Sequence, residues 1–237
     1  MTTDRFDGIE ACVFDAYGTL FDVHSAVARC RDDFGLEVEA AQTMSDVWRT
    51  KQLAYSWLRS LMGREHYVPF WQVTGDALDF ALETAFPGGP PTGLRQALMD
   101  SYSTLDTYPE VIGVLKTLKD SGMKTAILSN GSPDMLRSVC DSTGCTPLLD
   151  AVLSVDDLRV FKPDPSVYQL AVDRLGVSKP AAVSFQSSNA WDAAAASAFG
   201  FRVAWCNRFG QVRERLPGKP DIELTTLDAL PAIVGAA

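Results

Sequence analysis

Short apolar runs recur along the chain, and each is followed by turn residues and then by a segment with helical spacing. The apolar runs lie at 9–14, 124–129, 151–154, 181–185 and 201–205. Runs of this length and composition are typical of parallel strands that are buried on both faces. Four segments with helical spacing follow or separate them, at 110–121, 133–143, 165–175 and 190–199, and each stops at or beside a glycine. Since glycine readily takes the left-handed conformation that ends helices, the alternation predicts an α/β fold with a doubly wound, Rossmann-like parallel sheet.

The stretch from residue 24 to residue 105 interrupts this alternation. It contains only helical patterns, at 25–34, 43–62, 69–86 and 94–102, with a Pro- and Gly-rich loop at 86–91. We therefore expect a core formed by residues 1–23 and 106–237, and an inserted helical cap formed by residues 24–105. Because ligands bind at the carboxyl ends of parallel strands, an insertion that leaves the first strand there would cover the site.

Composition narrows the range of partners. The 237 residues carry a net charge of −9, which disfavours nucleic acid and anionic membranes as partners. No apolar run approaches the roughly 20 residues of a membrane span, and the N-terminal residues lack the pattern of a signal peptide. The five cysteines form no CxxC pair. These features predict a cytoplasmic protein with buried thiols rather than disulfides or a metal site.

Polar side chains follow the predicted strands at the edge where a site is expected. Asp15 follows the first strand, Ser129 and Asn130 follow the second, Lys162 lies after the third, and Ser187 to Asp192 follow the fourth. Each group alone has an ordinary structural explanation as a turn, a solvated loop or a helix cap. Their convergence from four strand ends favours a functional site.

Five segments together resemble the haloacid dehalogenase superfamily, and within it the L-2-haloacid dehalogenases. They are FDAYGTLFDVHS (14–25), WRTKQLAYSWLRSLM (48–62), ILSNGSP (127–133), VFKPDPSVY (160–168) and SSNAWDA (187–193). Phosphatases of the superfamily have a second Asp two positions after the nucleophile, which protonates an alkoxide leaving group. This chain has Tyr17 there, and a halide needs no proton. It also has Ser187, Ser188 and Asn189 where the phosphatases hold magnesium with carboxylates. The resemblance therefore implies no metal and no other cofactor.

The resemblance implies hydrolysis of short-chain L-2-haloacids to D-2-hydroxyacids in two steps. The Asp15 carboxylate attacks the carbon bearing the halogen with inversion, and water then attacks the carbonyl carbon of the resulting aspartyl ester. Lys162 would keep Asp15 ionised. The other implied catalytic residues are Thr19, which would orient Asp15; Arg49, which would receive the halide; and Ser187, Asn189 and Asp192, which would order the water and Lys162, with Asp192 the prime candidate for the base.

The implied substrate-binding residues surround this chemistry. Ser129 and the backbone N–H groups that follow Asp15, at Ala16 and Tyr17, would hold the substrate carboxylate. Asn130 would help Arg49 with the halide. The remaining binding residues are Leu53, Tyr17, Phe70 and Trp191, which would form an apolar wall, and Tyr168, which would position Lys162.

Some alternatives stay open at this point. A magnesium-dependent phosphatase is disfavoured by Tyr17, and a catalytically silent binding protein by the presence of Asp15, Lys162 and Arg49. A preference for haloacetate or fluoroacetate depends on pocket volume, which sequence does not show. The expected partners are a small haloacid and halide, and a homodimer is expected only from the resemblance.

Overall fold

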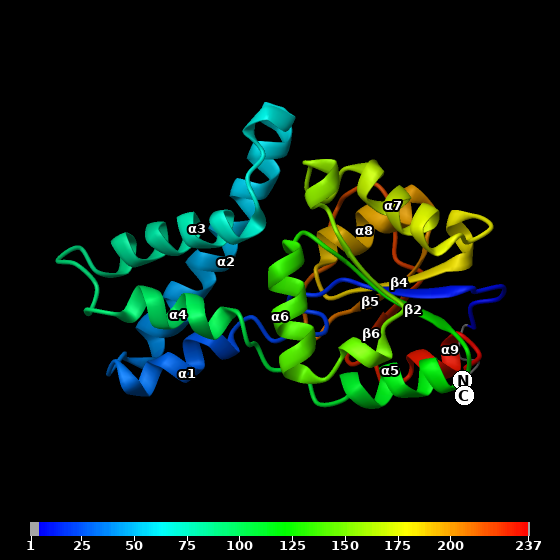
Figure 1. Ribbon diagram of the computed structural model, residues 1–237, viewed down its shortest axis with the longest axis horizontal. Coiled ribbons are helices and arrows are strands. Elements are labelled where there is room, and N and C mark those ends of the chain that lie inside the picture. The colour runs from blue at the N-terminus through cyan, green and yellow to red at the C-terminus, as the bar shows by residue number, and fades with distance from the viewer. Residues whose placement is uncertain (1–4, 237) are drawn as a thin grey trace.

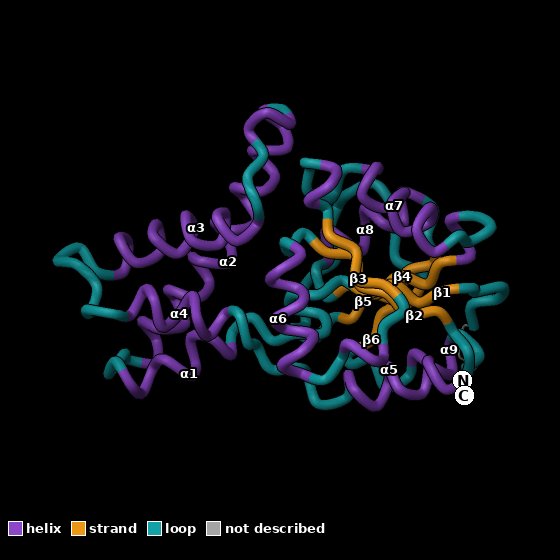
Figure 2. Tube along the Cα trace, viewed as in Figure 1, coloured by secondary structure: helices purple, strands orange, loops and turns teal. Residues whose placement is uncertain are grey.

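A six-stranded parallel sheet lies at the centre of the molecule, described here by a computed structural model over residues 5–236. The strand order is β3-β2-β1-β4-β5-β6, so β1 occupies the middle and the chain moves first to one side and then to the other (Figure 2). This is the predicted doubly wound α/β fold. The strands are β1 (Ala11–Phe14), β2 (Lys124–Ser129), β3 (Ala151–Ser154), β4 (Val183–Ser187), β5 (Arg202–Cys206) and β6 (Ile222–Leu224).

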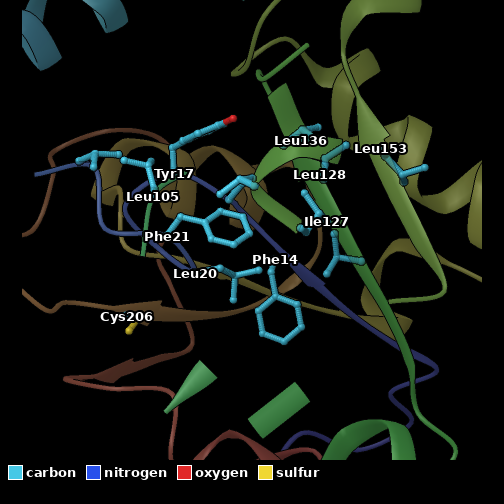
Figure 3. Close-up of a cluster of buried hydrophobic side chains, with 14 of the residues drawn as sticks. Phe14, Tyr17, Leu20, Phe21, Leu105, Ile127, Leu128, Leu136, Leu153 and Cys206 are labelled. Carbon is cyan, nitrogen blue, oxygen red and sulfur yellow. The ribbon is translucent and has the colours of Figure 1, made fainter. Parts of the chain in front are cut away.

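The central strand is buried on both faces, as its continuous apolar run predicts. All four residues of β1 are fully buried, and Val13 pairs with Ala126 of β2 and Phe185 of β4. Side chains from β1, β2 and the turn after β1 form one apolar cluster (Figure 3). Asp15, the residue after β1, is therefore attached to a rigidly packed strand.

Helices cover both faces of the sheet, with α5 and α9 together on one face and α7 and α8 together on the other (Figure 1). Gly144 and Gly176 are left-handed at the ends of α6 and α7, as their positions predict. The helices of this part are α5 (Val111–Asp120), α6 (Pro133–Thr143), α7 (Pro165–Leu175), α8 (Ala190–Phe199) and α9 (Leu230–Ile233), with short 3₁₀ turns η2 (Thr146–Leu148), η3 (Asp156–Leu158) and η4 (Pro180–Ala182).

The segment between β1 and α5 forms a separate group of helices beside the sheet domain, as predicted (Figure 1). Its elements are α1 (Ser25–Asp33), α2 (Val38–Met62), η1 (Arg64–His66), α3 (Phe70–Ala85) and α4 (Leu94–Tyr102). The long helix α2 begins five residues before the predicted start at Thr43. Glu39 lies in its first turn, where a negative charge is favourable, and Ala41 is buried, so this turn is held by both charge and packing.

The sequence-based boundaries of the sheet were incomplete. Strand β4 begins at Val183 and β5 at Arg202, later than expected, and residues 180–182 form a 3₁₀ turn instead. The edge strand β6 and helix α9 were not predicted. Both have only three or four residues, and the residues of β6 are partly or largely exposed, so neither has a long enough apolar pattern to be recognised.

The cysteines agree with the expectation of buried thiols: all five are free and buried. Within residues 5–236, no helix combines the length and the apolar character that a membrane crossing needs.

Candidate active site

Four strand ends bring the predicted polar residues together. Asp15 directly follows β1, Ser129 ends β2, Lys162 lies in the loop between β3 and α7, and Asn189 follows β4. From β1 the strand order runs outward to β2 and β3 on one side and to β4, β5 and β6 on the other. Ligands bind in such folds at the point between β1 and β4 where the order changes direction. The sheet order therefore produces the convergence that spacing alone suggested.

The Asp15 carboxylate is held by donors on both oxygens. Its Oδ2 accepts hydrogen bonds from the Thr19 hydroxyl at 3.0 Å and from Asn189 Nδ2 at 2.8 Å, and its Oδ1 accepts from Lys162 Nζ at 3.1 Å. The Asp15 side chain is only 10% exposed. Fixed donors in a nearly dry site replace water around the carboxylate, so its orientation is set before a substrate binds.

Lys162 places a buried ammonium between two carboxylates. Its side chain is 1% exposed, and Nζ lies 2.9 Å from Asp192 Oδ2 as well as 3.1 Å from Asp15 Oδ1. Burial by itself would lower the pKa of Lys162, but the charges of Asp15 and Asp192 outweigh burial and raise that pKa above its ordinary value. Lys162 is therefore a permanent cation at neutral pH. Its backbone N–H donates to Asn130 Oδ1 at 2.9 Å, which ties its loop to the end of β2.

Asp192 is the more deeply buried of the two carboxylates. Its Oδ1 accepts from the Tyr168 hydroxyl at 2.7 Å and its Oδ2 from Lys162, and the side chain is fully buried. Burial raises the pKa of Asp192, the neighbouring Asp15 charge raises it further, and Lys162 opposes both. Burial also raises the pKa of Tyr168 well above its ordinary value, so its hydroxyl stays protonated and donates to Asp192.

Arg49 enters the site from helix α2. Arg49 Nη2 donates to Asn189 Oδ1 at 3.1 Å and to the Tyr17 carbonyl at 3.3 Å. Arg49 Nη1 donates to Gln52 Oε1 at 2.7 Å. The helical insertion therefore supplies a guanidinium to the same amide side chain that orients Asp15. Arg49 therefore places a positive charge at the site of an otherwise acidic protein, which is the charge that an anionic ligand would need.

These residues enclose a small cavity of about 10 Å³, which is room for about one water molecule. Burial raises the pKa of Tyr17 well above its ordinary value, so this wall residue is neutral. Tyr17 also stacks on Tyr102 with ring centroids 5.5 Å apart. The cavity is lined by Asp15, Tyr17, Arg49, Leu53, Phe70, Ser129, Asn130, Lys162, Asn189 and Trp191.

Comparison with known proteins identifies the family of the chain. The haloacid dehalogenase-like hydrolase family model matches residues 9–200. The chain belongs to the haloacid dehalogenase-like hydrolases. It is 47% identical to (S)-2-haloacid dehalogenase 1 of Pseudomonas sp. (strain CBS-3), over 96% of this chain and 97% of that protein.

Two crystal structures extend the comparison. A dehalogenase structure matches with a TM-score of 0.90 and 44% identity, over 96% of this chain and 98% of the other. The L-2-haloacid dehalogenase from Xanthobacter autotrophicus with chloropropionic acid covalently bound matches with a TM-score of 0.85 and 38% identity, over 95% and 98% of the two chains. The likeness covers the helical cap as well as the sheet.

Five of the site residues expected for this family do not line the cavity. They are Ala16, Thr19, Tyr168, Ser187 and Asp192. Thr19 and Asp192 act on Asp15 and Lys162, as described above. The Ala16 carbonyl accepts from the N–H groups of the turn that follows it. Ser187 Oγ accepts from the Asn189 N–H at 3.2 Å, and Tyr168 contacts Asp192. The roles of all these residues stay predictions.

Two supporting residues of this family site, Gln52 and Tyr102, were not predicted, and Ser188 was named only as part of the polar segment after the fourth strand. Gln52 is 1% exposed and connects Arg49 to Thr74, since its Nε2 donates to Thr74 Oγ1 at 2.7 Å. Its position three residues after Arg49 on one helix could have revealed it. The Ser188 N–H donates to Thr19 Oγ1 at 2.8 Å. Tyr102 comes from the end of α4, and no sequence pattern joins it to Tyr17.

Two carboxylates lie at the site, those of Asp15 and Asp192. Within the described residues 5–236, no group of three or more His, Cys, Asp or Glu side chains is arranged to hold a metal ion. A hard cation such as magnesium takes several oxygen ligands, mostly from carboxylates. At this haloacid dehalogenase-like site the Lys162 ammonium lies between the carboxylates instead.

Proposed function

We propose that this protein hydrolyses short-chain L-2-haloacids to D-2-hydroxyacids and halide through an ester formed on Asp15. The observation that carries the proposal is the Asp15 carboxylate itself, held by Thr19, Asn189 and Lys162 at a small cavity that Arg49 also lines. A nucleophile oriented in this way needs no base to activate it, because it is already an anion. The likeness to (S)-2-haloacid dehalogenases supports this assignment.

In the first step, an Asp15 oxygen forms a bond to carbon 2 while the bond from that carbon to the halogen breaks. The halide leaves with the electron pair toward Arg49 and Asn130, which both line the cavity. The substrate carboxylate lies near Ser129 and the N–H groups of Ala16 and Tyr17. Attack from the face opposite the halide inverts carbon 2, so an L-haloacid gives a D-hydroxyacid.

In the second step, water adds to the carbonyl carbon of the Asp15 ester and loses a proton, and the bond from that carbon to the hydroxyacid oxygen breaks. The departing oxygen takes up a proton to give the hydroxyacid, and the Asp15 carboxylate is regenerated. The Lys162 ammonium beside Asp15 Oδ1 stabilises the oxyanion that develops on that group. Asp192 remains the candidate for the base. Asp192 does not line the cavity and both its oxygens accept hydrogen bonds, so its direct part in this proposal is to hold the Lys162 ammonium beside Asp15.

The remaining expectations complete the proposal. Residues 24–105 serve as a cap that supplies Arg49, Leu53 and Phe70 to the cavity, and residues 1–23 with 106–237 serve as the core. A cytoplasmic location and a homodimer remain predictions.

The test is chloride release from the two enantiomers of 2-chloropropionate. Release from the L enantiomer with formation of D-lactate is expected, with little from the D enantiomer. Asp15→Asn is expected to lower the rate by about 10⁴-fold or more, while Asp134→Asn, whose side chain is 89% exposed, keeps the full rate. Equal rates with both enantiomers would overturn the proposal, as would phosphate release from a phosphomonoester that requires magnesium.

A single turnover in heavy-oxygen water tests the intermediate. The proposal expects the first label in the Asp15 side chain, because water attacks the ester carbonyl. Label found directly in the hydroxyacid would instead indicate attack of water on carbon 2.

A further inference from the structure

A large apolar groove lies beside the catalytic cavity. Its volume is about 800 Å³, against about 10 Å³ for the cavity. The groove is bounded by α2 on one side, by α8 on another, and by the loop that carries Lys162. Among its walls are Trp57 and Leu61 of α2, Trp191 and Phe199 of α8, and Phe161 of the loop.

The groove lies next to the cavity along helices α2 and α8. On α2, Leu53 lines the cavity, while Trp57 and Leu61 follow at intervals of four residues and line the groove. Residues spaced in this way share one helix face, and the eight helical steps from Leu53 to Leu61 span about 12 Å. On α8, Trp191 lines both spaces.

Two indole rings pack together where these spaces meet: Trp191 lines both the cavity and the groove, and Trp57 lines the groove. The rings of Trp57 and Trp191 meet edge to face, with centroids 5.2 Å apart and an interplanar angle of 82°. Both indole nitrogens are buried and, within the described residues, neither donates a hydrogen bond. Buried Trp N–H groups usually find an acceptor, so this pair is held by packing alone. Replacing either ring therefore breaks no hydrogen bond.

We propose that Trp57 and Trp191 form the partition that limits the chain length of the substrate, and that the groove behind them accommodates an alkyl tail when the partition is opened. The inference rests on the proposed dehalogenase function and specifies its substrate range. The occupant is the hydrocarbon chain of a 2-haloalkanoate, which extends from carbon 2 past Leu53. Its chemistry matches walls made of aromatic and aliphatic side chains, and each methylene that enters the groove strengthens binding by about fourfold.

Substitution of Trp57 gives a more specific test than substitution of Trp191. It lines the groove and not the cavity, so its truncation leaves the groups around Asp15 in place. Trp57→Ala removes the ring against which Trp191 packs, and Trp191 can then turn away from the cavity. Trp71→Ala is the matched control, because Trp71 is a partly exposed tryptophan on α3 that lines neither space.

The experiment compares kcat/KM for L-2-chlorohexanoate and L-2-chloropropionate. In Trp57→Ala the ratio of the long to the short substrate is expected to rise by at least about tenfold, as two or three methylenes enter the groove. Trp191→Ala is expected to raise it as well, and Trp71→Ala is expected to leave it unchanged. If Trp57→Ala does not fold, Trp57→Leu fills part of the space and is expected to raise the same ratio to a smaller extent.

The outcomes separate this inference from the function on which it rests. If the unmodified protein releases chloride from L-2-chloropropionate but the ratio stays constant in folded Trp57 variants, the partition is refuted and the function stands. An equal rise in Trp71→Ala also refutes the partition. If the unmodified protein releases no chloride from either substrate, the proposed function itself fails.

Discussion

Replacing Lys162 by Met tests the electrostatic arrangement of the site most directly. The change keeps an unbranched side chain of similar length but removes the charge between Asp15 and Asp192. Two carboxylates that shared one ammonium would then face each other in a buried space. Asp192 already has a raised pKa, because it is fully buried, and loss of Lys162 removes the charge that opposes that shift.

The distances set the size of the effect. At 2.9 and 3.1 Å, with an effective dielectric constant of about 20, each pair contributes about 5–6 kcal/mol of Coulomb energy. Much of this offsets the cost of burying the three charges. Removal of one partner from a buried pair usually costs about 3–5 kcal/mol, because the other charge remains buried. We therefore expect Lys162→Met to lower the free energy of unfolding by about 3–5 kcal/mol.

Urea unfolding, followed by circular dichroism, measures this loss. The double variant Lys162→Met with Asp192→Asn removes the stranded charge and is expected to recover about 2 kcal/mol relative to Lys162→Met alone. Losses that simply add in the double variant would refute the reasoning, because they would mean that the two groups do not interact. Neither variant should release chloride at more than a small fraction of the original rate.

Three further predictions follow from the same geometry. Because the pKa of Lys162 is raised above its ordinary 10.5, its stabilising charge is fully present below that pH and is lost as pH rises through the higher folded-state value. The unfolding free energy should therefore not decline from loss of this charge until pH exceeds 10.5. An earlier fall in unfolding free energy that is absent from Lys162→Met would contradict this. Thr19→Val removes one donor to Asp15 Oδ2 and should lower kcat by about 10- to 100-fold with little change in KM, as steady-state kinetics would show. Treatment with EDTA should leave chloride release unchanged, and a loss that magnesium restores would favour the phosphatase alternative.

Much of the fold could be predicted because it depends on local patterns. The continuous apolar run before Asp15 indicated a strand buried on both faces, and the glycines after the helices indicated where they end. The inserted helices were recognisable as a break in the alternation. The edge strand β6 could not be predicted, since a three-residue, partly exposed strand carries almost no pattern.

The candidate site divides in the same way. Residue types at successive strand ends led to Asp15, Lys162 and Asn189, because parallel strands place their carboxyl ends at one edge of the sheet. The contact of Arg49 with Asn189 joins residues 140 positions apart, and only packing of the cap against the core produces it. Arg49 was predicted as a site residue only from the family resemblance, because no spacing of residues along the chain points to it.

Local sequence patterns were enough to predict most of the elements and the reactive groups they carry, because helix and strand periodicity, capping and strand-end chemistry act over a few residues. The tertiary structure decided the rest. It buried Lys162 between two carboxylates, closed the cavity to about 10 Å³, and set Trp57 against Trp191 beside an apolar groove. These features depend on distances between segments that are remote in the chain, and burial and Coulomb interactions take their magnitude from those distances.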